Sequence, residues 1–125
     1  MEAIAKLRKH RTSPRKMRLV ADMIRGMQTQ KALATLKHIP QHAAIPMAKL
    51  LQSGIANWNQ RHNKDKKATP SLYIKTIHVD QGSTLKRIQP ASRGRALPIR
   101  KKSSHLTLTI APTSVLNTKT PKTDK

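Results

Sequence analysis

Apolar and polar residues alternate near both ends of this sequence, which predicts a β-strand at each place. The first strand is expected within residues 1–12, and its apolar positions are Ala3, Ala5 and Leu7. The second alternation is cleaner and predicts a half-buried strand. Its apolar positions are Leu106, Leu108 and Ile110, which alternate with His105, Thr107 and Thr109.

Helical spacing of apolar residues begins after the first strand. A helix is expected over residues 14–25, because Ser13 suits the N-cap, Pro14 the first helical position and Gly26 the end. Its apolar stripe is Met17, Val20, Ile24 and Met27, with Met23 beside them. Thr29 is expected to cap a second helix of about two turns, which Pro40 ends. The apolar side of that helix carries Ala32, Leu33 and Leu36.

A third helix is expected over residues 42–60. Its apolar stripe is Met47, Leu50, Leu51, Gly54, Ile55 and Trp58. Pro46 either lies in the first turn or bends the helix, and Gly54 is expected to let another backbone approach closely. The polar residues 59–70 that follow predict a surface connection.

Residues 72–80 predict another strand, but their apolar positions change parity. Leu72 and Ile74 share one parity and Ile77 and Val79 the other, so the strand either carries a bulge or changes the face it buries. Residues 111–125 are rich in Thr, Lys, Pro and Asn and predict a flexible tail. The expected organisation is one domain over residues 1–110, with the order strand, three helices, two strands.

Composition limits the core and points to the partner. Hydrophobic residues make up 36% of the chain, Phe is absent, and there is one Trp and one Tyr, so a small core of aliphatic residues is expected. Lys and Arg number 26 against 5 Asp and Glu, which gives a formal net charge of +21. Positive charges at this density repel one another in a compact chain, and a bound polyanion would neutralise them. The polyanion that we expect is nucleic acid.

Several classes of function are excluded by what the sequence lacks. Without cysteine, the chain has no disulfide framework, thiolate zinc site or catalytic thiol. No apolar run approaches the roughly 20 residues that span a bilayer, and the N-terminus has no secretory apolar segment. Glycine-rich nucleotide loops are absent too. A soluble intracellular protein without a cofactor and without a membrane partner is therefore expected.

Residues 81–104, between the last two predicted strands, are the most informative segment. They contain no acidic residue, and their positive residues are Lys86, Arg87, Arg93, Arg95, Arg100, Lys101 and Lys102. The simplest geometry continues the flanking strands outward as a two-stranded arm that reverses at residues 91–94. An isolated hairpin is marginally stable in water, so a phosphate-rich partner is expected to hold it. The alternative is a disordered basic loop that only adds solubility.

A second basic cluster crosses the end of the first strand and the start of the first helix. Its members are Lys6, Arg8, Lys9, His10, Arg11, Arg15, Lys16 and Arg18. Asp22 cannot balance this density of positive charge, and a helix N-terminus at Pro14 adds backbone donors suited to phosphate. RNA contact is favoured over a merely solvated helix face.

Metal binding and catalysis have little support in the sequence. His38 and His42 have a metal-ligand spacing, but Pro40 interrupts the helix that this spacing requires. The five acidic residues are scattered, and only Asp80 borders the basic arm. No catalytic residue and no metal ligand is therefore assigned.

Four separated segments resemble the large-subunit ribosomal protein L twenty-two family, of the bacterial or organellar type. They are TSPRKMRLVADMIRG at 12–26, SGIANW at 53–58, HVDQGSTLKRI at 78–88 and RGRALPIRKKSSHLTLTI at 93–110. The resemblance implies an α+β domain of three helices on a small three-stranded antiparallel sheet, with a long basic β-hairpin that lines the nascent-peptide exit tunnel. The implied partners are large-subunit rRNA, neighbouring ribosomal proteins and the nascent polypeptide, on a cytoplasmic or organellar ribosome.

The resemblance also assigns residues by position. Those expected to bind rRNA are Arg8, Arg11, Ser13, Arg15, Lys16, Arg18, Arg25, Lys86, Arg87, Arg100, Lys101, Lys102, Ser104 and His105. Those expected at the hairpin tip are Pro90, Ala91, Ser92, Arg93, Gly94 and Arg95. The chain departs from the family at Ala91 and Lys102, where Arg is common. It also departs at Trp58 and Asn59, where a small and an acidic residue are frequent.

Three other functions remain open on the sequence. An architectural DNA-binding protein also uses a basic β-arm, and Pro90 or Pro98 would serve as its wedge. A small RNA-processing enzyme would depend on Asp80 or a histidine. A cationic membrane-active protein is disfavoured, because the helices carry charge without aromatic anchors.

Overall fold

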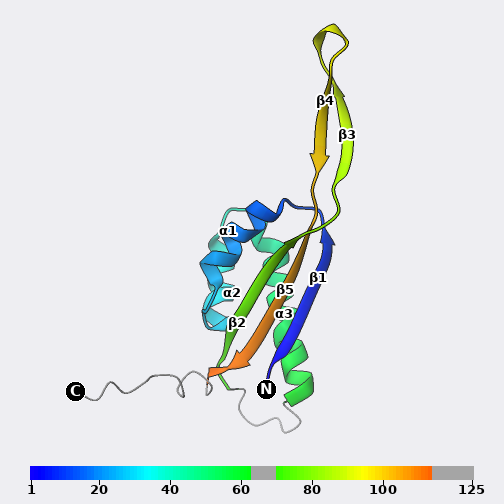
Figure 1. Cartoon of the computed structure of the whole chain (residues 1–125). Helices are drawn as coiled ribbons and strands as arrows, with labels where there is room; N and C mark the ends of the chain where they lie inside the picture. Colours follow the sequence, from blue (N-terminus) through cyan, green and yellow to red (C-terminus); the bar gives the residue numbers. More distant parts are fainter. Residues whose placement is uncertain (63–69, 114–125) are drawn as a thin grey trace, which may run out of the picture.

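The fold, seen in a computed structural model that describes residues 1–62 and 70–113, is of the α+β class (Figure 1). Within these residues the helices are α1 (Pro14–Ile24), α2 (Thr29–His38) and α3 (Ala44–His62). The strands are β1 (Ala3–His10), β2 (Leu72–Gln81), β3 (Leu85–Pro90), β4 (Ala96–Lys101) and β5 (Ser104–Pro112). The predicted class and order of elements are confirmed.

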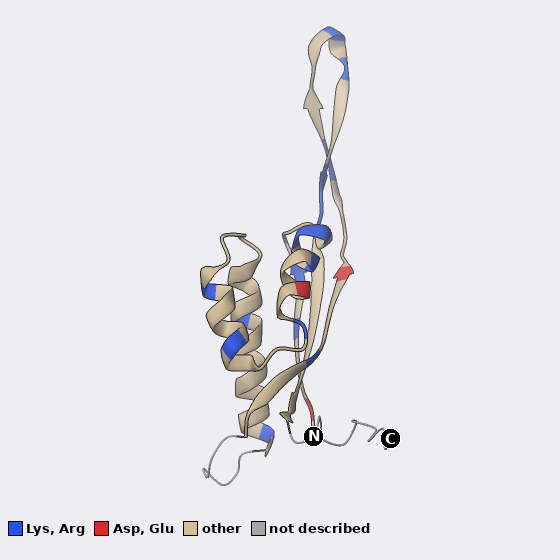
Figure 2. Ribbon diagram, turned by 90° about the vertical axis from the view of Figure 1, so that its left-hand side faces the viewer, with Lys and Arg blue, Asp and Glu red and all other residues tan. Residues whose placement is uncertain are grey.

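One antiparallel sheet has the order β1-β5-β2, and β3 pairs with β4 in a second sheet. β5 occupies the centre because its apolar positions, Leu106, Leu108 and Ile110, are all buried. The helices lie on one face of the three-stranded sheet, with α1 against β2 and α3 against β1 and β5 (Figures 1 and 2).

The parity change in the third predicted strand is a bulge. The register of β2 against β5 shifts between Ile74, opposite Ile110, and Thr76, opposite Thr109. Lys75 is the extra residue, and it forms an exposed ion pair with Glu2. Because of this shift, Ile74 and Ile77 are both buried although their parities differ.

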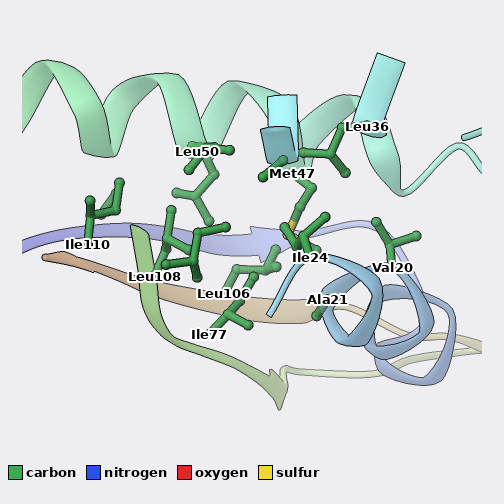
Figure 3. Packing of buried hydrophobic residues seen from close by; sticks show 14 of the residues in the cluster. Val20, Ala21, Ile24, Leu36, Met47, Leu50, Ile77, Leu106, Leu108 and Ile110 are labelled. Carbon is green, nitrogen blue, oxygen red and sulfur yellow. The ribbon is translucent and has the colours of Figure 1, made fainter. Parts of the chain in front are cut away.

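The hydrophobic core lies between α3, α1 and the sheet (Figure 3). Gly54 permits the closest approach of α3 to the sheet: a Cβ atom there would lie 2.7 Å from Cδ1 of Ile110 and 3.6 Å from Cβ of Ala5. Side chains, and not the predicted second backbone, therefore occupy the space beside this glycine. Trp58 is buried at the end of the same stripe, and its ring lies 5.5 Å from that of His62.

The helix ends differ in detail from the sequence predictions. Ser13 occupies the N-cap of α1, but its side chain makes no capping hydrogen bond. Gln28, not Thr29, is the N-cap of α2, which has 10 residues and is nearly three turns long. Pro46 lies in the first turn of α3, as one of the two readings predicted, and α3 includes residues 59–62 of the expected connection. Residues 63–69 of that connection and 114–125 of the expected tail lie outside the described residues.

Candidate nucleic-acid interface

The basic arm is a regular hairpin. β3 and β4 pair antiparallel from Leu85 opposite Lys101 to Pro90 opposite Ala96. The chain reverses at Ser92–Gly94, where Arg93 has φ 60° and Gly94 φ 70°, and the amide of Ala91 donates to the carbonyl of Arg95 at 2.9 Å. Every residue of both strands is exposed. The predicted pairing and the predicted place of reversal are both present.

The base of the arm is held where β2 and β5 end. The amide of Gly82 donates to the carbonyl of Ser103 at 2.8 Å, and Oγ of Ser103 donates to the carbonyl of Ser83 at 2.6 Å. A Cβ on Gly82 would lie 3.1 Å from the carbonyl oxygen of Ser103, so a larger residue would force the two strands apart. These contacts set the direction in which the arm leaves the domain.

Charge along the arm is unbalanced. Lys86 lies directly opposite Arg100, and like charges in that position destabilise a strand pair unless an anion lies between them. On the same face but nearer the tip, Ile88 lies opposite Pro98. Ile88 is 70% exposed, so this outer part of the arm offers an apolar surface next to a cationic one.

A cleft beneath the arm joins the two basic clusters that the sequence keeps apart. It has a volume of about 790 Å³ and contains no acidic lining residue. Its lining residues are Arg11, Thr12, Ser13, Arg15, Lys16, His42, Arg100, Lys101 and Lys102. We call this the basic cleft. Its walls are the β1–α1 connection with the start of α1, the segment before α3, and the end of β4.

The position of the basic cleft follows from local structure. Nη1 of Arg11 donates to the carbonyl of Lys102 at 3.4 Å, which links the β1–α1 connection to the returning strand of the arm. The first turn of α1 opens into the cleft at Ser13, where free backbone N–H groups favour an anion. Lys and Arg gather at this end of the domain and again at the tip of the arm (Figure 2).

Two arginines predicted to bind RNA also act within the fold. Nε and Nη2 of Arg18 donate to the carbonyl of Val79 at 3.3 and 3.2 Å. Nη2 of Arg25 donates to the carbonyl of Ile77 at 3.0 Å, and its Nη1 pairs with Asp22 at 2.6 Å. Both guanidinium groups therefore fasten α1 to β2, and neither lines the basic cleft.

The strand residues predicted to bind RNA fall into different environments. Arg8 is exposed on β1, and Lys86 and Arg87 are exposed on β3. Ser104 is fully buried at the start of β5, so its side chain is not exposed in the free chain, and its contact with RNA stays a prediction. Nδ1 of His105 accepts a hydrogen bond from the amide of Lys9 at 3.0 Å. The predicted tip residues, 90–95, lie at the far end of the arm from the basic cleft (Figure 1).

His42 and Thr12 line the basic cleft although the sequence analysis did not place them there. In the sequence, the spacing of His42 from His38 indicates only metal binding, but His38 ends α2 and His42 precedes α3. In the described part of the chain, no three His, Asp or Glu side chains are grouped as metal ligands would be. Asp80 lies opposite His105 in the sheet. Nδ1 of His105 already accepts a hydrogen bond from the amide of Lys9.

None of the helices in residues 1–62 and 70–113 is both long and apolar enough to cross a membrane. The cleft, the base of the arm and its tip carry positive charge, with an apolar stretch of the arm between them. A polymer of phosphates matches this chemistry.

Comparison with known proteins agrees with this chemistry. A sequence model of the family described as "Ribosomal protein L22p/L17e" matches residues 5–111. A protein named "Large ribosomal subunit protein uL22" from Bacteroides fragilis is 54% identical over 104 residues, which are 83% of this chain and 76% of that protein. Proteins of the same name from Pelobacter propionicus and Christiangramia forsetii are 50% identical over 111 residues and 48% over 108 residues. The match to the Pelobacter protein spans 89% of this chain and 97% of that protein. The match to the Christiangramia protein spans 86% of this chain and 80% of that protein.

Proposed function

The chain belongs to the ribosomal protein L22p/L17e family, and from this premise we propose that it is a structural constituent of the large ribosomal subunit that binds large-subunit rRNA. The observation that carries the proposal is the basic cleft, in which Arg15, Lys16 and Arg100 face one space without an acidic neighbour. Its role is that of a binding and assembly protein, and its place is on the ribosome.

Phosphate contacts in the basic cleft supply affinity. Each Lys or Arg that neutralises a phosphate releases condensed counterions, so binding weakens steeply as salt is added. The backbone amides at the start of α1 fix the orientation of one phosphate group, because backbone donors are held rigidly and a lysine side chain is flexible. The cleft gathers its Lys and Arg residues from two distant segments of the chain, 11–16 and 100–102, so it binds RNA in one register relative to the domain.

The arm extends this contact away from the domain. RNA phosphates between Lys86 and Arg100 remove the repulsion of that cross-strand pair, which gives the arm its order when RNA binds. Because the arm is exposed on both faces, it can pass between two rRNA segments and hold them together during subunit assembly. Its tip, residues 90–95, then lines the exit tunnel and contacts the nascent polypeptide, while the domain contacts neighbouring ribosomal proteins.

The proposal is tested by binding of the full chain to a transcript of the large-subunit rRNA across a salt series. Replacing Arg15 and Lys16 with Ala is expected to lower affinity and to reduce the slope of log affinity against log salt by about 1 to 2. The matched control replaces Lys31 and Lys37, which are exposed on α2 outside the cleft, with Ala and removes the same charge. Equal losses in the two variants, or equal affinity for duplex DNA of similar length, would contradict the proposal.

A further inference from the structure

A second cavity lies between β1 and the first half of α3. Its volume is about 490 Å³, within the range of sites that hold small ligands. The lining residues are Lys6, Leu7, His10, His42, Ile45, Pro46, Lys49, Leu50 and Ser53. We call it the β1–α3 cavity. None of the fold contacts described above fills it.

The walls of the β1–α3 cavity combine apolar and cationic groups. Leu7, Pro46 and Leu50 provide the apolar surface, and Leu50 points from α3 toward the sheet (Figure 3). Ile45 is 55% exposed at the edge and leaves an apolar surface that a partner can cover. Lys6 and Lys49 are the cations, and no acidic residue lines the space. Such a site fits a flat, weakly polar group that carries a negative charge beside it.

His10 supplies a polar group without a partner. Its Nε2 atom is shielded from solvent and has no hydrogen-bond partner among residues 1–62 and 70–113. Burial, and in second place the nearby His42, lower the pKa of His10, so its ring is neutral at pH 7 and one nitrogen can donate or accept. A hydrogen bond with a ligand would give this buried nitrogen the partner that it lacks.

The cavity and the basic cleft share one lining residue. His42 lines both spaces, so a strand that lies in the cleft reaches the mouth of the cavity at this residue. A peptide partner would meet two lysines and no compensating acid, whereas an RNA strand carries its own phosphates past Lys6 and Lys49. The shared residue and the charge therefore favour RNA over protein as the occupant.

We propose that the β1–α3 cavity receives one unpaired nucleobase of the RNA strand bound in the basic cleft. The base lies against Leu7, Pro46 and Leu50, its edge bonds to the free nitrogen of His10, and its phosphate lies between Lys6 and Lys49. This inference rests on the proposed binding of rRNA and adds a contact to a base, whereas phosphate contacts carry no sequence information.

Filling the cavity tests the inference. Ser53 is exposed on α3, and a Phe at this position leans toward the helix N-terminus and hence into the space beside Lys49. Ser53→Phe is expected to lower affinity for the rRNA transcript about tenfold, because the base loses its apolar contacts and its bond to His10. Gln52→Phe, on the exposed side of the same helix and outside the cavity, is the matched control and is expected to bind as the wild type does. Circular dichroism checks that both variants fold.

A second measurement uses the wild-type chain. Transcripts that carry 4-thiouridine are irradiated on the protein, and the crosslinked peptides are identified by mass spectrometry. Crosslinks to residues 6–10 and 45–53 support the inference, and their absence beside strong crosslinks in residues 11–16 contradicts it.

The outcomes separate this inference from the proposed function. If Ser53→Phe binds the transcript as tightly as wild type while the Arg15 and Lys16 replacement weakens binding, the cavity inference fails and rRNA binding stands. If Ser53→Phe instead lowers only incorporation into ribosomal subunits, the occupant is a neighbouring protein and the inference is overturned. If the wild type does not bind the transcript, the proposed function itself fails.

Discussion

The backbone N–H of Lys9 donates a hydrogen bond to Nδ1 of His105, at 3.0 Å across the β1–β5 pair. The register of the two strands shifts between Leu7 and His10, and Lys9 takes the left-handed conformation with φ 56°. The side chain of His105 thus replaces the ladder partner that the bulge removes. This bulge directs the chain from β1 toward Arg11 and the basic cleft.

Loss of this side-chain acceptor should loosen the bulge. His105→Leu is expected to lower the free energy of unfolding by about 0.5–1.5 kcal/mol, the usual net contribution of one hydrogen bond. His105→Asn keeps an acceptor near the position of Nδ1 and is expected to retain most of the stability. Urea unfolding of both variants measures the difference. Equal stability of the Leu and Asn variants would show that the bond to Lys9 contributes nothing.

At Gly54, the packing against the sheet and the helix propensity predict opposite effects of a change to Ala. Ala is favoured over Gly inside a helix by about 1 kcal/mol, but a Cβ here would press against Ile110 at 2.7 Å. Overpacking of this kind destabilises by roughly 1–3 kcal/mol, so Gly54→Ala is expected to lower the midpoint of thermal unfolding. Ser53→Ala, an exposed neighbour on α3, is the control and is expected to be neutral or slightly stabilising. A more stable Gly54→Ala protein would contradict the observed packing.

The pH dependence of stability should reflect His10. Its pKa in the folded state lies below the ordinary value of 6.5, so below that pH the unfolded chain binds more protons than the folded one. The contribution of His10 is therefore complete above pH 6.5 and is lost as the pH falls through its folded pKa. Urea midpoints measured from pH 7.5 down to pH 5 should decline, and His10→Gln should decline less. A decline of the same size in His10→Gln would assign the effect to other groups.

Repulsion between Lys86 and Arg100 should act in opposite directions in the free and the bound protein. Lys86→Gln removes the like-charge pair, so it is expected to slow hydrogen exchange of the arm amides in the free chain by a few-fold. The same change is expected to weaken rRNA binding, because a phosphate contact is lost. Lys101→Gln, opposite Leu85, is the control: it should weaken binding without slowing exchange. Unaltered exchange in Lys86→Gln would mean that the pair does not limit the order of the arm.

Much of the fold was predictable from local patterns. The alternation of Leu106, Leu108 and Ile110 identifies the central strand, and the parity change between Ile74 and Ile77 locates the bulge in β2. The segment between these strands had to return to the sheet, so its pairing as an arm followed from the two strands that flank it. These features depend on neighbours in sequence, or on one pairing between adjacent strands.

The site was only partly predictable, because it depends on tertiary contacts. Arg15 and Arg100 are far apart in the sequence, and only the packing of α1 near the base of the arm brings them to one cleft. Ser104 looks like any exposed serine in a basic run until the β5 register buries it. The hydrogen bond from Arg18 to the carbonyl of Val79 likewise joins elements that are distant in the chain. The same is true of His42, which lines both the basic cleft and the β1–α3 cavity.

The most direct measurement of the central claim is sedimentation of a tagged copy of the full chain from a native lysate, followed by a wash in high salt. The account predicts that the protein travels with large ribosomal subunits and stays on them after the wash, because the arm is enclosed by RNA. Release of the protein in the wash together with loosely bound basic proteins, or its sedimentation with DNA, would contradict the account.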